Sequence, residues 1–352
     1  MSRRMVMTKL TYGSLFTGVG GFDLGFDQQG YDCQWQVEWD QHCQQVLQYH
    51  WPEIPHHHDV RDVQGDLLAP VDVLTFGSPC QDLSVAGRRA GLVGEKSSMF
   101  HEAVRIIEEM RNATNRTYPR IAVWENVPGA FTSNKGRDFH TVLSSLENIG
   151  AMAQWWRILD AQYFGVAQRR RRLFLIAVFD PAIAKRIGTG PILPLGERRT
   201  GHPTSSRPTQ HAAATVATLL PGADSPNDRI VGPLDTFGRI SNQSVRMGHL
   251  VIPFHPHFAG GVRIQGDTIN TITARWGTGG NNGVMIAETG RVRRLTPLEC
   301  ERLMGWPDNH TLHRADGKTT SNGQRYKMCG NGVVAPVSNW IAKHLRPLLD
   351  AP

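Results

Sequence analysis

Short apolar runs alternate with amphipathic stretches over the first half of the chain. Residues 10–16 and 71–76 have the β-branched and aromatic character of buried strands, and a turn containing Gly follows each run. Residues 97–112 repeat apolar side chains at helical spacing. Strands that alternate with helices to about residue 180 predict a parallel, doubly wound α/β sheet. The other elements predicted here are strands at 34–37, 121–124, 154–159 and 173–179, and a helix at 138–150.

The alternation stops near residue 180. Residues 181–275 are rich in Pro, Gly, Thr, Ser and Arg and show no helical period, and this stretch is too long for a loop inside a compact domain. We therefore predict a second, smaller and irregular β-rich domain. The capping-box residues 296–299 predict a short helix, and residues 336–349 predict a last helix that returns to the first domain. The predicted domains are residues 8–185 with 322–352, and residues 186–321.

Composition adds a modest positive charge and no sign of a membrane segment. The 352 residues include 38 Lys and Arg against 31 Asp and Glu, a net charge of +7 that suits a polyanionic partner without requiring one. No apolar run approaches membrane-spanning length, so we expect a cytoplasmic protein. The odd number of scattered cysteines argues against a disulfide framework or a zinc site, and the His triplet at 56–58 cannot readily converge on one ion. We expect no metal.

A glycine cluster follows the first predicted strand. Gly18, Gly20 and Gly21 lie between a strand and a helix, where only glycine lets the backbone approach a nucleotide-like ligand closely. Such a cluster alone is often just a tight turn. Glu38 ends the second strand, where a carboxylate can hold the hydroxyls of a ribose, and Asp59 ends the third, where it could contact an adenine edge.

Two reactive side chains follow the next strands. Cys80 comes just after the strand at 71–76, at the sheet edge where open α/β sheets bind their ligands. Glu125 follows the strand at 121–124 and reaches the same edge. The local sequence alone favours simpler interpretations, namely a buried structural cysteine and a helix-capping carboxylate. An arginine cluster at 169–172 leads into the last strand, so part of it enters the sheet.

Taken together, seven segments closely resemble the DNA (cytosine-5) methyltransferases of bacterial and phage type. They occur in the order usual for that family, with a variable target-recognition region between the fifth and the sixth. The resemblance covers nearly the whole chain outside residues 181–265. The segments are FTGVGGF at 16–22, EWD at 38–40, GSPCQ at 77–81, ENV at 125–127, QRRRR at 168–172, RRLTPLE at 293–299 and GNGVV at 330–334.

The resemblance implies a Rossmann-like methyltransferase domain and a covalent mechanism. Cys80 would add as a thiolate to carbon 6 of a cytosine that has been flipped out of the duplex, because carbon 5 is a poor nucleophile until the ring is activated. Glu125 would neutralise the charge near N3, and Asn126 would help to fix the site. Arg170 and Arg172 would hold the cytosine O2 and order the catalytic loop. Carbon 5 would then take a methyl group from S-adenosylmethionine.

The resemblance also assigns cofactor and DNA contacts. Phe16 would lie against the adenine, with Trp39 beside it, Glu38 on the ribose and Asp59 on the adenine amino group. The remaining residues assigned to the cofactor are Thr17, Gly18, Gly20, Gly21, Val60, Gly77, Pro79, Asn331 and Val333. The residues assigned to DNA are Gln81, Ser84, Arg88 and Arg89 of a closing loop, together with Arg263, Thr271, Ile272 and Arg275 of the recognition region. For each of these last four, an ordinary hairpin of the small domain is an equally good interpretation.

The sequence departs from the family pattern at two positions. Ser78 stands where many relatives carry Phe, and Gly332 stands where Ser is usual. The partners expected are double-stranded DNA and a cognate restriction endonuclease, and we expect a monomer. Three alternatives remain open: a structured-RNA cytosine-5 methyltransferase, a nicotinamide or flavin oxidoreductase, and a catalytically silent DNA-binding member of the family.

Overall fold

The structure is a computed structural model that divides into two compact units. The first unit comprises Met1–Leu159, Arg171–Glu197 and Val337–Pro352, and the second comprises Asp160–Arg170 and Arg198–Pro336. The residues described are 9–78, 98–188, 190, 192–193, 252–258, 261–264, 269–274, 285–288 and 291–350.

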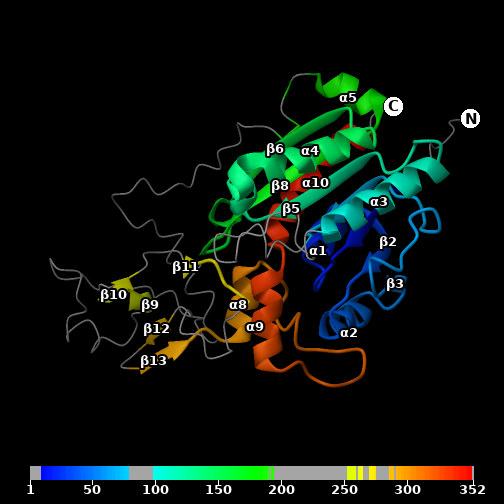
Figure 1. Ribbon diagram of the computed structural model, residues 1–352. Coiled ribbons are helices and arrows are strands. Elements are labelled where there is room, and N and C mark those ends of the chain that lie inside the picture. The colour runs from blue at the N-terminus through cyan, green and yellow to red at the C-terminus, as the bar shows by residue number, and fades with distance from the viewer. Residues whose placement is uncertain are drawn as a thin grey trace, which may run out of the picture. The chain divides into compact units, whose positions relative to one another are not determined.

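A seven-stranded sheet forms the centre of the first unit (Figure 1). Its strand order is β3-β2-β1-β4-β5-β8-β6. The order reverses where β1 pairs with both β2 and β4, and this reversal is the place at which open α/β sheets bind ligands. The strands are β1 (Thr11–Leu15), β2 (Asp32–Val37), β3 (His56–His57), β4 (Val73–Phe76), β5 (Ile121–Asn126), β6 (Ala153–Asp160) and β8 (Arg171–Val178).

The sheet is mixed, which corrects the prediction of a wholly parallel one. Strands β1 to β5 pair in parallel, whereas β8 runs antiparallel to β5. Only residues 161–170 connect β6 to β8, and a parallel crossover needs a dozen or more residues. Met152, just before β6, donates its N–H to the Val178 carbonyl at the end of β8 (2.8 Å). The chain therefore turns back after β6, and β8 fills the position between β5 and β6 in the opposite direction.

Helices cover both faces of this sheet, as the doubly wound prediction requires. On one face α3 and α4 pack into the main core, where the Phe100 ring meets Phe76 and Trp124. On the other face Phe22 of α1 meets Phe174 of β8 edge to face, with 6.3 Å between ring centroids. The helices in this part of the chain are α1 (Gly21–Gln28), α2 (Gln41–His50), α3 (Ser98–Ala113) and α4 (Arg137–Asn148).

The last helix, α10 (Ala335–Asp350), packs against α1. Gly25 makes the close approach possible, because a Cβ atom there would lie 2.0 Å from Ser338 Oγ. Ser338 donates its hydroxyl to the Gly21 carbonyl (2.9 Å), and Tyr31 donates its own to the Ala342 carbonyl (3.1 Å). The end of the chain thus supports the helix that follows the first strand.

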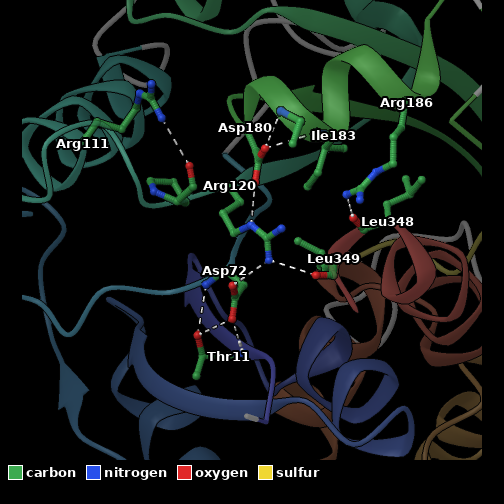
Figure 2. A network of polar contacts seen from close by, with 11 residues as sticks. Thr11, Asp72, Arg111, Arg120, Asp180, Ile183, Arg186, Leu348 and Leu349 are labelled. Atoms are coloured by element: carbon green, nitrogen blue, oxygen red, sulfur yellow. Dashed lines mark hydrogen bonds and ion pairs between the residues drawn. The ribbon is translucent and has the colours of Figure 1, made fainter. Parts of the chain in front are cut away.

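Arg120 joins the start, the middle and the end of the first unit (Figure 2). Its Nε donates to Asp180 (2.8 Å), and its Nη1 donates to Asp72 (3.3 Å) and to the Leu349 carbonyl (3.1 Å). Asp72 in turn accepts a hydrogen bond from the Thr11 backbone N–H (2.9 Å). These charged groups are largely buried, so their pairing matters more than that of surface ion pairs.

We expect Arg120→Ala to lower the free energy of unfolding by about 3 kcal/mol, because Asp72 and Asp180 lose their shared partner inside the protein. Urea unfolding followed by circular dichroism measures the change. The control is Arg186→Ala, which removes an exposed arginine that donates to the Leu348 carbonyl and should cost less than about 1 kcal/mol. Equal losses in the two variants would contradict a special role for Arg120.

The prediction that residues 181–275 contain no helix is wrong at their start. Helix α5 (Pro181–Ile187) follows Asp180, whose Oδ1 accepts hydrogen bonds from the backbone N–H groups of Ala182 (2.8 Å) and Ile183 (3.1 Å). An Asp cap with Pro at the first helical position is a recognised start signal. The helix is too short for its apolar period to show in the sequence.

In its described part, the second unit combines small sheets with the helices α8 and α9. Helix α8 begins with the predicted capping box, in which Thr296 and Glu299 exchange hydrogen bonds between side chain and backbone. Helix α9 was not predicted, because its residues are mostly polar. The sheets have the orders β10-β9-β12-β13 and β11-β7. The elements are β7 (Gln168–Arg169), β9 (Ile252–Phe258), β10 (Gly261–Ile264), β11 (Ile269–Asn270), β12 (Met285–Glu288), β13 (Arg291–Arg294), α8 (Pro297–Leu303) and α9 (Asn322–Asn331).

The division into functional domains at residues 8–185 with 322–352, and 186–321, remains a prediction. The compact units divide the chain at other residues, since residues 160–170 and 322–336 belong to the second unit. Across the described ranges, no helix is both long enough and apolar enough to cross a membrane.

Candidate active site

The chain turns sharply after β1. Phe16, Gly18 and Gly20 have positive φ angles of 54°, 63° and 85°. Glycine adopts this conformation freely, whereas an aromatic residue in it is strained by about 1–3 kcal/mol. Thr17 holds the turn in place, because its backbone N–H and its hydroxyl both donate to the Val37 carbonyl (3.1 Å each). Strain of this kind is often found where a backbone is shaped for a ligand.

The Glu38 carboxylate is fixed beside this turn. Its Oε2 accepts the Gly18 backbone N–H and its Oε1 accepts the Asp40 backbone N–H, both at 2.7 Å. Each carboxylate oxygen can accept a second hydrogen bond. A Cβ atom at Gly18 would meet no atom of the other described residues within 4 Å, so this part of the structure leaves the backbone open to a ligand.

An aromatic ring and a carboxylate follow on the neighbouring segments. Trp39 is 60% exposed, and the His58 ring meets it at 4.9 Å between centroids. Asp59 is nearly buried and binds Arg61 at both carboxylate oxygens, with a shortest distance of 2.6 Å. Hydrogen bonds from Arg61 hold the pKa of the Asp59 carboxyl below its usual value, so this group is a charged acceptor. Val60 is buried in the core.

Sequence analysis missed two residues of this region. Arg61 lies 5.4 Å above the Trp39 ring centroid, and its position two residues after Asp59 was an available signal. Trp51 covers the glycine turn, because a Cβ atom at Gly20 would lie 2.4 Å from its ring. No local signal marks Trp51, which is separated from the turn by β2 and α2.

Glu125 and Arg172 meet where β5 and β8 pair. Arg172 Nε lies 3.1 Å from Glu125 Oε1, and both side chains are mostly buried. A Cβ atom at Gly77 would be 3.4 Å from Glu125 Oε2, so the end of β4 also borders this carboxylate. Asn126 is buried, and its Oδ1 accepts the Val127 N–H (2.8 Å), while its Nδ2 has no hydrogen-bond partner among the described residues. These side chains share the edge that sequence analysis assigned to catalysis.

The unusual Ser78 has a structural explanation. Its buried Oγ accepts a hydrogen bond from Trp124 Nε1 at 2.9 Å. A phenylalanine here could not satisfy the buried indole N–H, and a buried unpaired donor costs about 1–3 kcal/mol. Ser78 therefore supplies the hydrogen-bond acceptor that the buried Trp124 indole needs.

The other predicted residues that the structure describes lie in the second unit. Arg170 and Ile272 are buried, Thr271 is half-buried and Asn331 is exposed. The Val333 carbonyl accepts a hydrogen bond from the Trp306 indole (3.0 Å). For Arg263 the structure describes only the strand β10, in which it pairs with His255. The predicted residues outside the described ranges are Pro79, Cys80, Gln81, Ser84, Arg88, Arg89 and Arg275.

A buried carboxyl group lies in the first turn of α1. Asp23 Oδ1 accepts from Gln36 Nε2 (2.7 Å) and from the Tyr12 hydroxyl (3.4 Å), and the Cys33 thiol lies 3.9 Å away. The Tyr12 hydroxyl also donates to Asp27 (2.8 Å). Burial, helped by the Asp27 charge, raises the pKa of Asp23 to about 7. The cluster therefore changes its charge near neutral pH.

We expect Asp23→Asn to flatten the pH dependence of stability between pH 5 and 8. The folded protein holds this proton more tightly than the unfolded chain, where an Asp pKa is about 3.9. Stability is therefore lost as pH rises from about 4 through 7, and an amide removes that loss. Urea unfolding at four pH values measures how the free energy of unfolding changes with pH. Asp32→Asn, at a more exposed carboxylate bound to Lys9, should leave the slope unchanged. Parallel curves for Asp23→Asn and wild type would contradict the assignment.

Comparison with known proteins decides the family. The model of the C-5 cytosine-specific DNA methylases matches residues 10–346. The chain belongs to this family. The resemblance inferred from the seven motifs is thus confirmed, and the protein is a DNA cytosine-5 methyltransferase.

Curated relatives and solved structures resemble this methylase over nearly its whole length. Type II methyltransferase M.Bsp6I of Bacillus sp. (strain RFL6) is 27% identical, with 96% of this chain and 98% of the relative covered. Type II methyltransferase M.HhaI of Haemophilus parahaemolyticus is 26% identical, with 98% and 96% covered. The crystal structure of S. pombe Dnmt2 methyltransferase superposes with a TM-score of 0.63 at 14% identity, covering 97% and 99%. That likeness confirms the predicted fold class.

The geometry of the methylase fits the methyl donor that the family implies, S-adenosylmethionine. The donor carries a nucleoside, whose ribose hydroxyls and adenine amino group need hydrogen-bond acceptors. Glu38 and Asp59 supply charged acceptors, and Trp39 supplies an exposed aromatic face. The open backbone at Gly18 leaves room beside them.

Proposed function

We propose that this methylase transfers a methyl group from S-adenosylmethionine to carbon 5 of a flipped-out cytosine in a specific sequence of duplex DNA. A covalent adduct with Cys80 carries the reaction. The observation that carries this proposal is the ion pair between Glu125 and Arg172 at the end of β5. Strand β4 runs parallel to β5 with Phe76 opposite Trp124, and Cys80 follows four residues after Phe76.

Cys80 is the nucleophile in this proposal. Its thiolate adds to carbon 6 of the cytosine, and the electron pair of the 5,6 double bond becomes available at carbon 5. Carbon 5 would take a methyl group that S-adenosylmethionine supplies when bound, and the electron pair of the broken carbon–sulfur bond would leave on sulfur. Loss of the carbon 5 proton to water would then drive out the thiolate and restore the aromatic ring. A thiolate suits both steps, because it is a strong nucleophile and a good leaving group.

Glu125 and Arg172 are proposed to handle the charge that this addition creates. Glu125 would protonate or hydrogen-bond N3 of the ring as negative charge develops. Arg172 holds one Glu125 oxygen at 3.1 Å, which orients the carboxyl group toward a substrate at the sheet edge. Its guanidinium has five N–H donors, so it can also hold the cytosine O2. Asn126 has a buried Nδ2 donor in the same strand end and is proposed to fix this site.

The cofactor, when bound, supplies the reactive methyl group. The methylase positions it through the turn after β1, where Phe16, Thr17 and the glycines provide backbone and ring contacts. Glu38 is proposed to hold the ribose, and Asp59 with Trp39 the adenine. Val60, Gly77, Asn331 and Val333 are proposed to complete the contacts.

A labelled methyl-transfer assay tests this function. The protein is incubated with S-adenosylmethionine carrying a labelled methyl group, with unmethylated duplex DNA or with structured RNA of similar length. Bisulfite sequencing then maps 5-methylcytosine in the DNA. We expect label in DNA only, within one short motif. Label in RNA alone, or cofactor binding without any transfer to DNA, would overturn the proposal.

A further inference from the structure

Gln168 and Arg170 bind one short segment of the second unit, residues 269–272. Strands β7 and β11 pair in parallel, with Ile269 opposite Gln168. Beyond the strands, Gln168 Oε1 accepts the Ile272 N–H (3.1 Å) and Arg170 Nη1 donates to the Ile272 carbonyl (3.1 Å). The Thr271 hydroxyl donates to the Arg169 carbonyl (2.9 Å). Asn270 also pairs with Arg169, so residues 168–170 hold residues 269–272 at every position.

The same guanidinium also holds a second segment. Arg170 Nη2 donates to the Gly330 carbonyl (2.9 Å) and to the Gly332 carbonyl (2.7 Å), on either side of Asn331. The two segments touch each other directly, because a Cβ atom at Gly330 would lie 2.1 Å from the Ala274 nitrogen. One side chain therefore joins the turn at 330–332 to the segment at 269–274.

Arginine suits this position better than lysine does. Arg170 is 2% exposed, and its rigid planar fork offers five N–H donors in fixed directions. Its two Nη atoms donate to three carbonyls, one in the segment at 269–274 and two in the segment at 330–332. A lysine ammonium is a compact group and cannot reach all three carbonyls from one place. A shift of either segment must therefore alter the hydrogen bonds of the other.

We propose that Arg170 is a positioning residue that couples DNA binding at Thr271 and Ile272 to cofactor binding at Asn331 and Val333. This inference rests on the proposed function, which assigns Asn331 and Val333 to the cofactor, and on the family resemblance, which assigns Thr271 and Ile272 to DNA. It adds a positioning role to the contact with the cytosine that the resemblance implies for Arg170, since three described guanidinium bonds lead to backbone carbonyls. Ligand at one segment orders the shared arginine and makes the other segment ready to bind.

The test measures a coupling factor. Calorimetry gives the Kd of S-adenosylhomocysteine, which cannot transfer a methyl group, with and without a duplex that contains the mapped motif. The ratio of the two Kd values is the coupling factor, and couplings between sites are typically 5–150-fold. We expect Arg170→Lys to reduce the wild-type factor at least about threefold. We expect the same reduction from Gln168→Leu, which removes the side-chain bond to Ile272 together with the bond to the Leu303 carbonyl (3.0 Å) and leaves Arg170 in place.

Arg325→Lys is the matched control. Arg325 is another buried arginine of the second unit, and its described hydrogen bonds go to Glu301 (2.8 Å), Thr311 (3.0 Å) and Asn309 (3.4 Å), which belong to neither segment. It should lower the melting temperature and preserve the coupling factor. A wild-type factor of one, or unchanged factors in Arg170→Lys and Gln168→Leu, would overturn the inference. If Arg170→Lys does not fold, the coupling factor of Gln168→Leu decides the test. Absence of methyl transfer by the wild-type protein would instead refute the proposed function.

Discussion

Cys80→Ser should bind S-adenosylmethionine normally and lose methyl transfer by at least about 10⁴-fold. A serine hydroxyl is almost entirely protonated at neutral pH and is a much weaker nucleophile than a thiolate, so carbon 6 of the cytosine is not attacked. Carbon 5 then stays unreactive even when the cofactor and the base are in place. Single-turnover transfer of a labelled methyl group measures the loss, and calorimetry measures cofactor binding in the same preparation.

Covalent trapping makes this test specific to the nucleophile. Duplex DNA with 5-fluorocytosine at the target should form a stable adduct with the wild-type protein, because fluorine cannot leave as the proton does. Cys80→Ser should form no adduct. Cys43→Ser, at a buried cysteine of α2, is the control and should trap DNA normally. Methyl transfer at the wild-type rate by Cys80→Ser would exclude the covalent mechanism.

Glu125→Gln should lower the rate of the chemical step by about 10²–10⁴-fold with little change in DNA affinity. An amide cannot donate a proton to N3, and its uncharged oxygen is a weaker acceptor for Arg172. The change preserves the size of the side chain, so the sheet edge keeps its packing. Rapid-quench measurement of the single-turnover rate reports the chemical step, and filter binding reports the affinity for DNA.

Glu147→Gln is the control for this substitution, because Glu147 is an exposed carboxylate on α4. It should have the wild-type rate. A second test follows adduct formation on 5-fluorocytosine DNA, which should slow in Glu125→Gln because the carboxyl group acts during addition of the thiolate. A normal rate of adduct formation would confine Glu125 to a later step and contradict its proposed role.

Local patterns in the sequence were sufficient for the parts of the fold that depend on neighbouring residues. The turn after β1 was predicted from the glycine cluster between a strand and a helix, and Gly18 and Gly20 there have the positive φ angles that glycine adopts freely. The capping box of α8 was predicted for the same kind of reason. The antiparallel direction of β8 was not predicted, because it depends on the short connection after β6 and on the position left open beside β5.

The contacts of the candidate site likewise differ in how far the sequence could predict them. The pairing of Glu125 with Arg172 could be anticipated only from the family resemblance, since the two residues lie on different strands. The partners of Arg170 could not be anticipated, because Ile272 and Gly330 are more than about a hundred residues away and leave no mark on the sequence around it. Hydrogen bonds between residues this far apart in the sequence can be identified only once the fold is known.

The departures from the family pattern also have long-range causes. A Cβ atom at Gly332 would lie 2.4 Å from the Trp306 ring, so the serine that is usual there would collide with the indole. Ser78 is likewise matched to Trp124. Each departure therefore compensates for a large aromatic residue elsewhere in the chain.

The first unit combines an early part of the chain with a late one, and this arrangement determines when its fold can be completed during synthesis. The sheet strands are all made before residue 180, yet α10 supplies the contacts to Gly25 and Tyr31, and Leu349 accepts from Arg120. Residues 337–350 are made only after residues 198–336 of the second unit. Until then the nascent chain lacks the support beneath its glycine turn, so the first unit reaches its full stability only once α10 has been made.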